Sequence, residues 1–258
     1  MSELALQWSI LWPALAAGLL VVVSHVPLGQ QVFARGIVFI DLAIAQVAGL
    51  GVIAASSFGL PVEGWSAQAA AGLAALAGAL LLTWTERRRP EAQEALIGIL
   101  FVLASAMQIL LLANDPHGGE NLRELLSGQI LWVSESQLLR TAILTAVFAL
   151  VWFRWRERIG RIGFYLLFAV MVTASVQLVG VYLVFTSLIV PAVATYRLAA
   201  NRQLATGYVL GAASYVAGLV LSVVTDLPSG AVIVWAMALL GLLVHLSGGR
   251  KPQAPPPG

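Results

Sequence analysis

The sequence predicts an all-α polytopic membrane protein, a bundle of about nine transmembrane helices. Of its 258 residues, 60% are hydrophobic and only 10% are charged, whereas a soluble domain carries about 25% charged residues. The apolar runs approach the ~20 residues that a helix needs to cross a hydrocarbon core. A net charge of +2 is too small to indicate a nucleic-acid partner, and the lack of cysteine excludes disulfides and thiolate metal sites.

The apolar runs are separated by short polar connections. In chain order, the predicted spans are 9–27, 37–58, 67–85, 95–113, 138–153, 162–179, 180–196, 204–224 and 229–247. The run 162–196 holds no charged residue, so it forms either one long tilted helix or two short ones. Residues 1–248 thus form one membrane domain, and the Gly/Pro-rich residues 249–258 are expected to be a disordered cytoplasmic tail.

Charge asymmetry favours two helices in that run. With nine spans, 12 of the 14 Lys and Arg residues lie on one side, and only Arg123 and Arg140 lie on the other. With eight spans the division is 8 against 6. Because cytoplasmic loops are enriched in Lys and Arg, we predict an outside N-terminus and a cytoplasmic C-terminus in a bacterial inner membrane. The first residues show no signal-peptide pattern, so the first run should stay in the membrane.

The second predicted span carries two polar residues, Asp41 and Gln46, within the stretch FIDLAIAQVAGLG. Ionisable groups are costly in lipid, which makes such a residue a functional candidate. The alternatives are structural: Asp41 caps a neighbouring helix or pairs with Arg35, and Gln46 forms hydrogen bonds between helices. Residues five apart lie about 140° apart around a helix. Asp41 and Gln46 therefore do not converge on one ion if the helix is regular.

The three histidines give weaker candidates. His25 is expected to be packed or interfacial, and His245 is expected to be structural. His117 lies with Asp115 and Glu120 in the stretch NDPHGGEN, where acid and imidazole groups could hold a cation loosely. The alternative is that these are solvated loop charges. The candidate metal ligands are therefore Asp41 and Gln46, followed by Asp115 and His117.

Three stretches together resemble the membrane permeases of bacterial ABC importers for zinc and manganese. They are Pro27–Val52, which begins with a Pro-Leu-Gly turn, Glu94–Ala106, and Val176–Ala199 with its Ser-Leu-Ile-Val-Pro-Ala element. The segments Thr225–Gly230 and Leu125–Leu138 also fit, so the resemblance covers nearly the whole chain.

This resemblance implies a fold, a function and a set of partners. It implies a homodimeric permease in the membrane lipid that moves a divalent metal ion, its substrate, and binds no cofactor of its own. It also implies a separate ATPase and an extracytoplasmic metal-binding protein. The chain has no Gly-x-x-x-x-Gly-Lys-Ser/Thr phosphate loop, so we expect no ATPase activity from this polypeptide.

The sequence departs from the family pattern in two places. The family's aspartate and histidine, four residues apart, correspond to Leu42 and Gln46, so its metal pair is not carried over. We therefore expect no tight zinc site in the second span, and favour a hard or weakly held ion.

The second departure is the basic connection Phe153–Gly163, which is too short for a helix that docks on an ATPase. Its arginines could bind lipid headgroups instead. Coupling then uses other loops, such as Thr85–Gln93, and the ATPase contact is expected to be smaller. Two alternatives stay open from the sequence: a non-transporting membrane partner with the same fold, and a secondary cation transporter or channel that uses Asp41.

Overall fold

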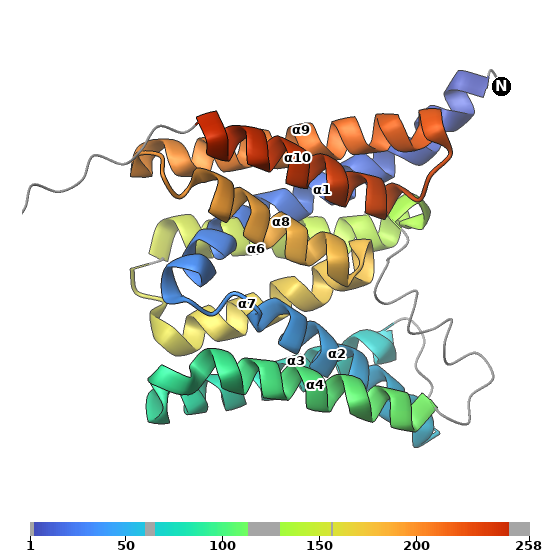
Figure 1. The fold of residues 1–258 in the computed structure, drawn as a ribbon. Coiled ribbons are helices and arrows are strands. Elements are labelled where there is room, and N and C mark those ends of the chain that lie inside the picture. The colour runs from blue at the N-terminus through green and yellow to red at the C-terminus, as the bar shows by residue number, and fades with distance from the viewer. Residues whose placement is uncertain (1–2, 60–64, 113–129, 156, 248–258) are drawn as a thin grey trace, which may run out of the picture.

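The computed structural model describes residues 3–59, 65–112, 130–155 and 157–247. Over these residues the chain is helical and contains no strand. The α-helices, labelled as in Figure 1, are α1 (Glu3–Arg35), α2 (Ile40–Ser57), α3 (Trp65–Arg88), α4 (Gln93–Leu112), α6 (Glu135–Trp155), α7 (Gly160–Val179), α8 (Val181–Thr195), α9 (Ala200–Thr225) and α10 (Ser229–Ser247). Two short 3₁₀ segments, η1 (Pro90–Ala92) and η2 (Ile130–Trp132), precede α4 and α6. The all-helical prediction is confirmed, whereas residues 248–258, with the predicted tail, lie outside the described part.

The uncharged run 162–196 forms two helices, as the charge asymmetry predicts. The break is at Gly180, whose φ of 84° is a conformation that residues with a Cβ rarely adopt. Among the described helices, eight are long and apolar enough to cross a membrane. The exception is α8, whose 15 residues extend about 22 Å, less than the ~30 Å hydrocarbon core.

The first helix is longer than the sequence predicts. The expected span ends at residue 27 before a Pro-Leu-Gly turn, but α1 continues through Pro27 to Arg35. Membrane helices tolerate an internal proline because neighbouring helices satisfy the freed backbone groups. Gly29 allows one such neighbour to approach closely: a Cβ built there would lie 1.9 Å from the backbone oxygen of Leu188 in α8.

The helices form two groups joined by α7. One group contains α1, α8, α9 and α10, the other contains α2, α3 and α4, and α7 lies between α6 and α3 (Figure 1). The start of α1 and the end of α10 lie at opposite ends of the bundle (Figure 1). This arrangement is compatible with termini on opposite sides of a membrane.

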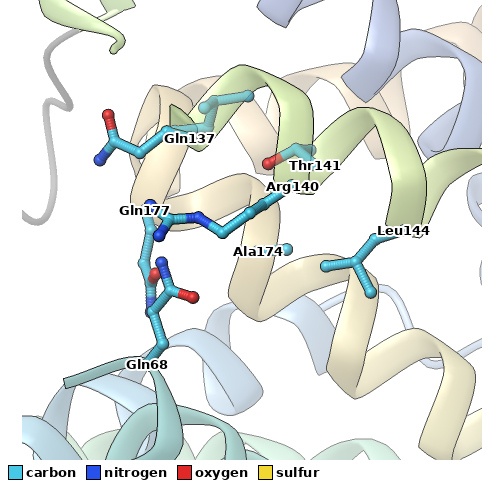
Figure 2. Close-up of a pocket in the computed structure, with 8 residues that line it drawn as sticks. Gln68, Gln137, Arg140, Thr141, Leu144, Ala174 and Gln177 are labelled. Atoms are coloured by element: carbon cyan, nitrogen blue, oxygen red, sulfur yellow. The ribbon is translucent and has the colours of Figure 1, made fainter. Parts of the chain in front are cut away.

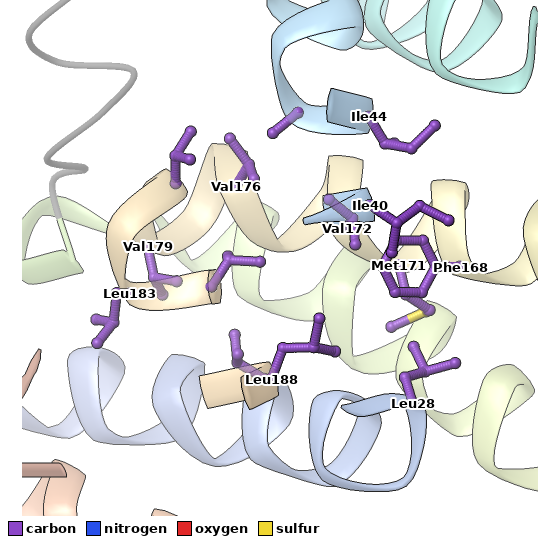
Figure 3. Close-up of a cluster of buried hydrophobic side chains, with 14 of the residues drawn as sticks. Leu28, Ile40, Ile44, Phe168, Met171, Val172, Val176, Val179, Leu183 and Leu188 are labelled. Atoms are coloured by element: carbon purple, nitrogen blue, oxygen red, sulfur yellow. The ribbon is translucent and has the colours of Figure 1, made fainter. Parts of the chain in front are cut away.

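The apolar core lies where the two groups meet. Figure 3 shows Leu28 of α1, Ile40 and Ile44 of α2, Phe168 of α7 and Leu188 of α8 around this junction. These side chains are completely buried. By contrast, large apolar side chains on the outer faces of α4 and α6 are exposed, including Leu103 and Leu139 at 63% each. An exposed apolar surface of this kind suits lipid contact.

Candidate functional site

Asp41 lies in the first turn of α2 and is buried, with 1% of its surface exposed. Within the described residues, neither of its carboxylate oxygens has a hydrogen-bond partner. The predicted alternative of a pair with Arg35 is wrong, because the ion pair found among the described residues joins Arg161 and Glu86; the Arg35 guanidinium lies over the Phe164 ring, 4.1 Å from its centroid. The positive end of the α2 dipole favours a negative charge at this position. Asp41 therefore faces the interior of the bundle, with no cationic side chain bonded to it.

A second carboxylate lies at the same end of α2. The backbone N–H of Phe39, at the N-cap of α2, donates to Oε1 of Glu94 over 3.3 Å. Glu94 is in the first turn of α4, so this bond joins the starts of the two helices. Its Oε2 is buried and accepts no hydrogen bond from the described residues. Two acidic side chains with free oxygen atoms thus lie near the start of α2.

Gln46 lies about 1.4 turns further along α2 and is bonded to a side chain of α4. Nε2 of Gln108 donates to the side-chain Oε1 of Gln46 and to its backbone oxygen, both over 2.8 Å. Gln46 is 3% exposed and Gln108 is fully buried. Since α2 is helical throughout residues 40–57, Asp41 and Gln46 point in different directions. The structural interpretation of Gln46 as a contact between helices accounts for its position.

The other predicted ligands do not add a metal cluster. Asp115 and His117 lie outside the described residues. Within the described part of the chain, no group of three His, Cys, Asp or Glu side chains is placed to hold a metal ion. The donor groups near the start of α2 are therefore carboxylate oxygens, which hard cations prefer.

The two described histidines are packed against protein. Nδ1 of His25 lies 2.9 Å from the Ser24 hydroxyl and 3.1 Å from the Val21 carbonyl oxygen. His25 is fully buried, so it is a packed residue and not an interfacial one. The His245 ring stacks on Tyr196, with ring centroids 5.6 Å apart. This contact supports the structural role predicted for His245.

Two connections at one end of the bundle are bonded to each other. Arg161, at the start of α7, forms an ion pair of 3.3 Å with Glu86, near the end of α3. Beside this pair, Nε2 of Gln93 donates to the Tyr165 hydroxyl over 3.2 Å. The described residues between α6 and α7 form a turn and no docking helix. This ion pair thus joins two segments, Thr85–Gln93 and Phe153–Gly163. The sequence presents them as alternative surfaces for coupling to an ATPase.

Gln108, Glu94 and Gln93 were not predicted as site residues. Each had a visible signal in the sequence. Gln108 is an amide within an apolar run, and the acid and amide at residues 93–94 precede the same run.

Comparisons with known proteins agree with the fold. A profile described as the ABC 3 transport family matches residues 7–160 and 156–247. The manganese transport system membrane protein MntC of Halalkalibacterium halodurans is 27% identical over 257 residues, covering 91% of this chain and 86% of its own length. A probable iron transport system membrane protein of Haemophilus influenzae is 25% identical over 240 residues, covering 85% and 83% of the two chains.

Two solved structures share the arrangement of helices. One is PsaBC from Streptococcus pneumoniae in complex with Fab, with a TM-score of 0.75, 21% identity, and coverage of 94% of this chain and 93% of that chain. The other is an inward-facing conformation of a putative metal-chelate type ABC transporter. Its TM-score is 0.68 at 17% identity, with coverage of 95% and 90%.

Proposed function

The chain belongs to the ABC 3 transport family, and from this premise we propose that it is the membrane permease of a metal-ion importer powered by a separate ATPase. The relatives named for manganese and iron transport support the substrate class. The helix bundle supports the permease role, and eight of the described helices can span a membrane. The energy source is assigned to another polypeptide because the chain has no phosphate-loop motif.

The observation that carries a metal role for this chain is the Asp41 carboxylate. It is buried in a membrane bundle, and both of its oxygens lack a hydrogen bond from the described residues. A buried carboxylate without a counter-charge is costly, and a passing cation removes that cost. Asp41 is thus proposed as a transient ligand of the ion, and Glu94 as a second carboxylate near it.

The donor chemistry favours a hard ion over zinc. Carboxylate and carbonyl oxygens suit Mn²⁺, whereas Zn²⁺ sites combine carboxylate with histidine or cysteine ligands, which the described residues near Asp41 do not supply. Gln46, at the position of the family histidine, has its side-chain oxygen occupied by Gln108. We therefore assign Mn²⁺ or Fe²⁺ as the substrate class, with oxygen ligation at the start of α2.

Coupling to the ATPase is proposed at the end of the bundle that holds the Glu86–Arg161 ion pair. The chain offers a paired loop surface there, not a separate docking helix. The family resemblance further supports a homodimer that receives its ion from an extracytoplasmic binding protein. With the proposed orientation, which places the N-terminus outside and the C-terminus in the cytoplasm, Arg35 and the connection Phe153–Gly163 face the cytoplasm.

The test is metal uptake in proteoliposomes that hold the permease and its partner ATPase. Asp41→Asn keeps the size of the side chain and removes its charge, so Mn²⁺ uptake should fall about tenfold or more, since ligand charge sets the affinity for a hard cation. The matched control is Asp226→Asn, at an acid outside the helices that tolerates asparagine because its φ is 55°. Uptake of Mn²⁺ at the unmodified rate by the Asp41→Asn protein would refute the role of this carboxylate.

A further inference from the structure

Arg140 is the centre of a small polar pocket at the other end of the bundle. The pocket is lined by Gln68 of α3, Gln137, Arg140, Thr141 and Leu144 of α6, and Ala174, Gln177 and Leu178 of α7. Figure 2 shows the side chains of Gln177 and Gln68 beside the Arg140 guanidinium, whereas the Gln137 amide points away from it and accepts hydrogen bonds from Ser134. The cavity of about 40 Å³ holds roughly three water-sized groups at 10–15 Å³ each. This is room for the oxygen atoms of one anionic group, not for a whole metabolite.

The charge in this pocket has no counter-ion within the described residues. The ion pair found in that part of the chain joins Arg161 and Glu86, and none involves Arg140. The Nε atom of Arg140 is buried without a hydrogen-bond partner. Its guanidinium carbon lies 5.1 Å from the centroid of the Trp65 ring, a contact that orients the cation but does not neutralise it. The amides and the Thr141 hydroxyl around it can donate further hydrogen bonds.

The pocket extends along α6 from near the start of that helix toward its more apolar middle. Gln137 is two residues after the start of α6, whereas Leu144 is about 13 Å along that helix. Leu144 is 38% exposed, and Leu139 and Ile143 of the same stretch of α6 are 63% and 56% exposed. On α3, Trp65 is 70% exposed at the interfacial position that tryptophan prefers. Polar groups near the helix ends are therefore followed along α6 by exposed apolar side chains.

From this geometry we infer that the pocket binds the phosphate of an anionic phospholipid, such as phosphatidylglycerol, in the outer leaflet. The guanidinium donates to the phosphate oxygens as a planar fork. The amides of Gln68 and Gln177 complete the shell, and an acyl chain lies along the exposed apolar side chains of α6. Basic pockets between transmembrane helices recognise headgroups in this way. A lipid bound here would hold α3 and α6 together across α7, on which both helices pack.

The experiment is native mass spectrometry of the purified protein titrated with phosphatidylglycerol. Arg140→Gln should weaken retention of one lipid by about tenfold or more, the effect expected when a charged hydrogen bond is lost. The matched control is Arg202→Gln, at an exposed arginine near the start of α9 and outside the basic connection Phe153–Gly163. That substitution removes the same charge and should leave retention unchanged.

Two further variants keep the test decisive if Arg140→Gln does not fold. One is Arg140→Lys, which keeps the charge but loses the planar fork of the guanidinium. The other is Gln177→Leu, at an exposed amide of the pocket. Each should reduce retention of the lipid by less than Arg140→Gln does. Equal retention by all pocket variants would overturn the inference. So would displacement of the lipid by millimolar inorganic phosphate, which would indicate a site for a free anion. If the variants keep the lipid but lose binding of the purified extracytoplasmic protein, the pocket is a protein-docking contact and the inference is wrong.

Discussion

Nε2 of Gln108, in α4, donates hydrogen bonds to both the backbone oxygen and the side-chain Oε1 of Gln46, in α2, each over 2.8 Å. This contact occupies the position where the resembled family has a metal-binding histidine. The side-chain oxygen of Gln46 therefore accepts a hydrogen bond that connects α2 to α4. The divergence of the second span is therefore structural at Gln46, whereas the carboxylate of Asp41, the proposed ligand, has no hydrogen-bond partner among the described residues.

Gln108→Leu should destabilise the bundle by about 1–2 kcal/mol, because it leaves the buried side-chain oxygen of Gln46 without its donor. The measurement is thermal unfolding in detergent, with Met107→Leu as control at a neighbouring residue that is 46% exposed. The double variant Gln46→Leu/Gln108→Leu should recover part of the loss, since the side-chain acceptor is then removed along with the donor. An unchanged unfolding temperature for Gln108→Leu would show that the contact carries no stability.

Gly29→Ala should prevent normal assembly of α1 against α8. Its Cβ would lie 1.9 Å from the Leu188 backbone oxygen, and backbone cannot move aside as a flexible side chain can. We expect a loss of about 1–3 kcal/mol or more, seen as a lower unfolding temperature or a loss of monodisperse protein. The control is Gly98→Ala, where a Cβ meets no atom within 4 Å. Alanine there should be neutral or stabilising, as it is a better helix former.

The Glu86–Arg161 pair should matter more for coupling than for stability. Arg161 is 46% exposed and Glu86 is 16% exposed, and pairs near water contribute only about 0–1 kcal/mol. Glu86→Gln and Arg161→Gln should leave the unfolding temperature nearly constant but reduce metal-stimulated ATP hydrolysis by the complex. Exchange of the two residues, Glu86→Arg with Arg161→Glu, should restore part of the activity. Full hydrolysis by both single variants would place the coupling surface elsewhere.

The orientation can be tested directly because the chain has no cysteine. A single cysteine introduced by Ser136→Cys lies in the first turn of α6, and one introduced by Arg158→Cys lies before α7. In intact cells with a permeable outer membrane, an impermeant maleimide should label the first and not the second. Opened cells should show labelling of both. The reverse pattern in intact cells would invert the proposed topology.

The sequence by itself determined the helical membrane class, because span length and loop charge depend on composition along the chain. It also determined the division of the run 162–196 into two helices, which the structure places on either side of Gly180. The interpretation of Asp41 as facing the bundle interior follows from the cost of a carboxylate in lipid. These features are local or obey a rule that acts along one segment.

Tertiary structure alone decided which polar groups meet. The continuation of α1 through Pro27 depends on neighbours that the local sequence does not contain. Gln108 is separated from Gln46 by 62 residues, Glu94 from Phe39 by 55 residues, and the pocket around Arg140 is assembled from three helices. Periodicity predicts the face of a helix on which a residue lies, but the partner of that face depends on how the helices pack. Hydrogen bonds and unpaired charges between helices therefore became visible only in the folded bundle.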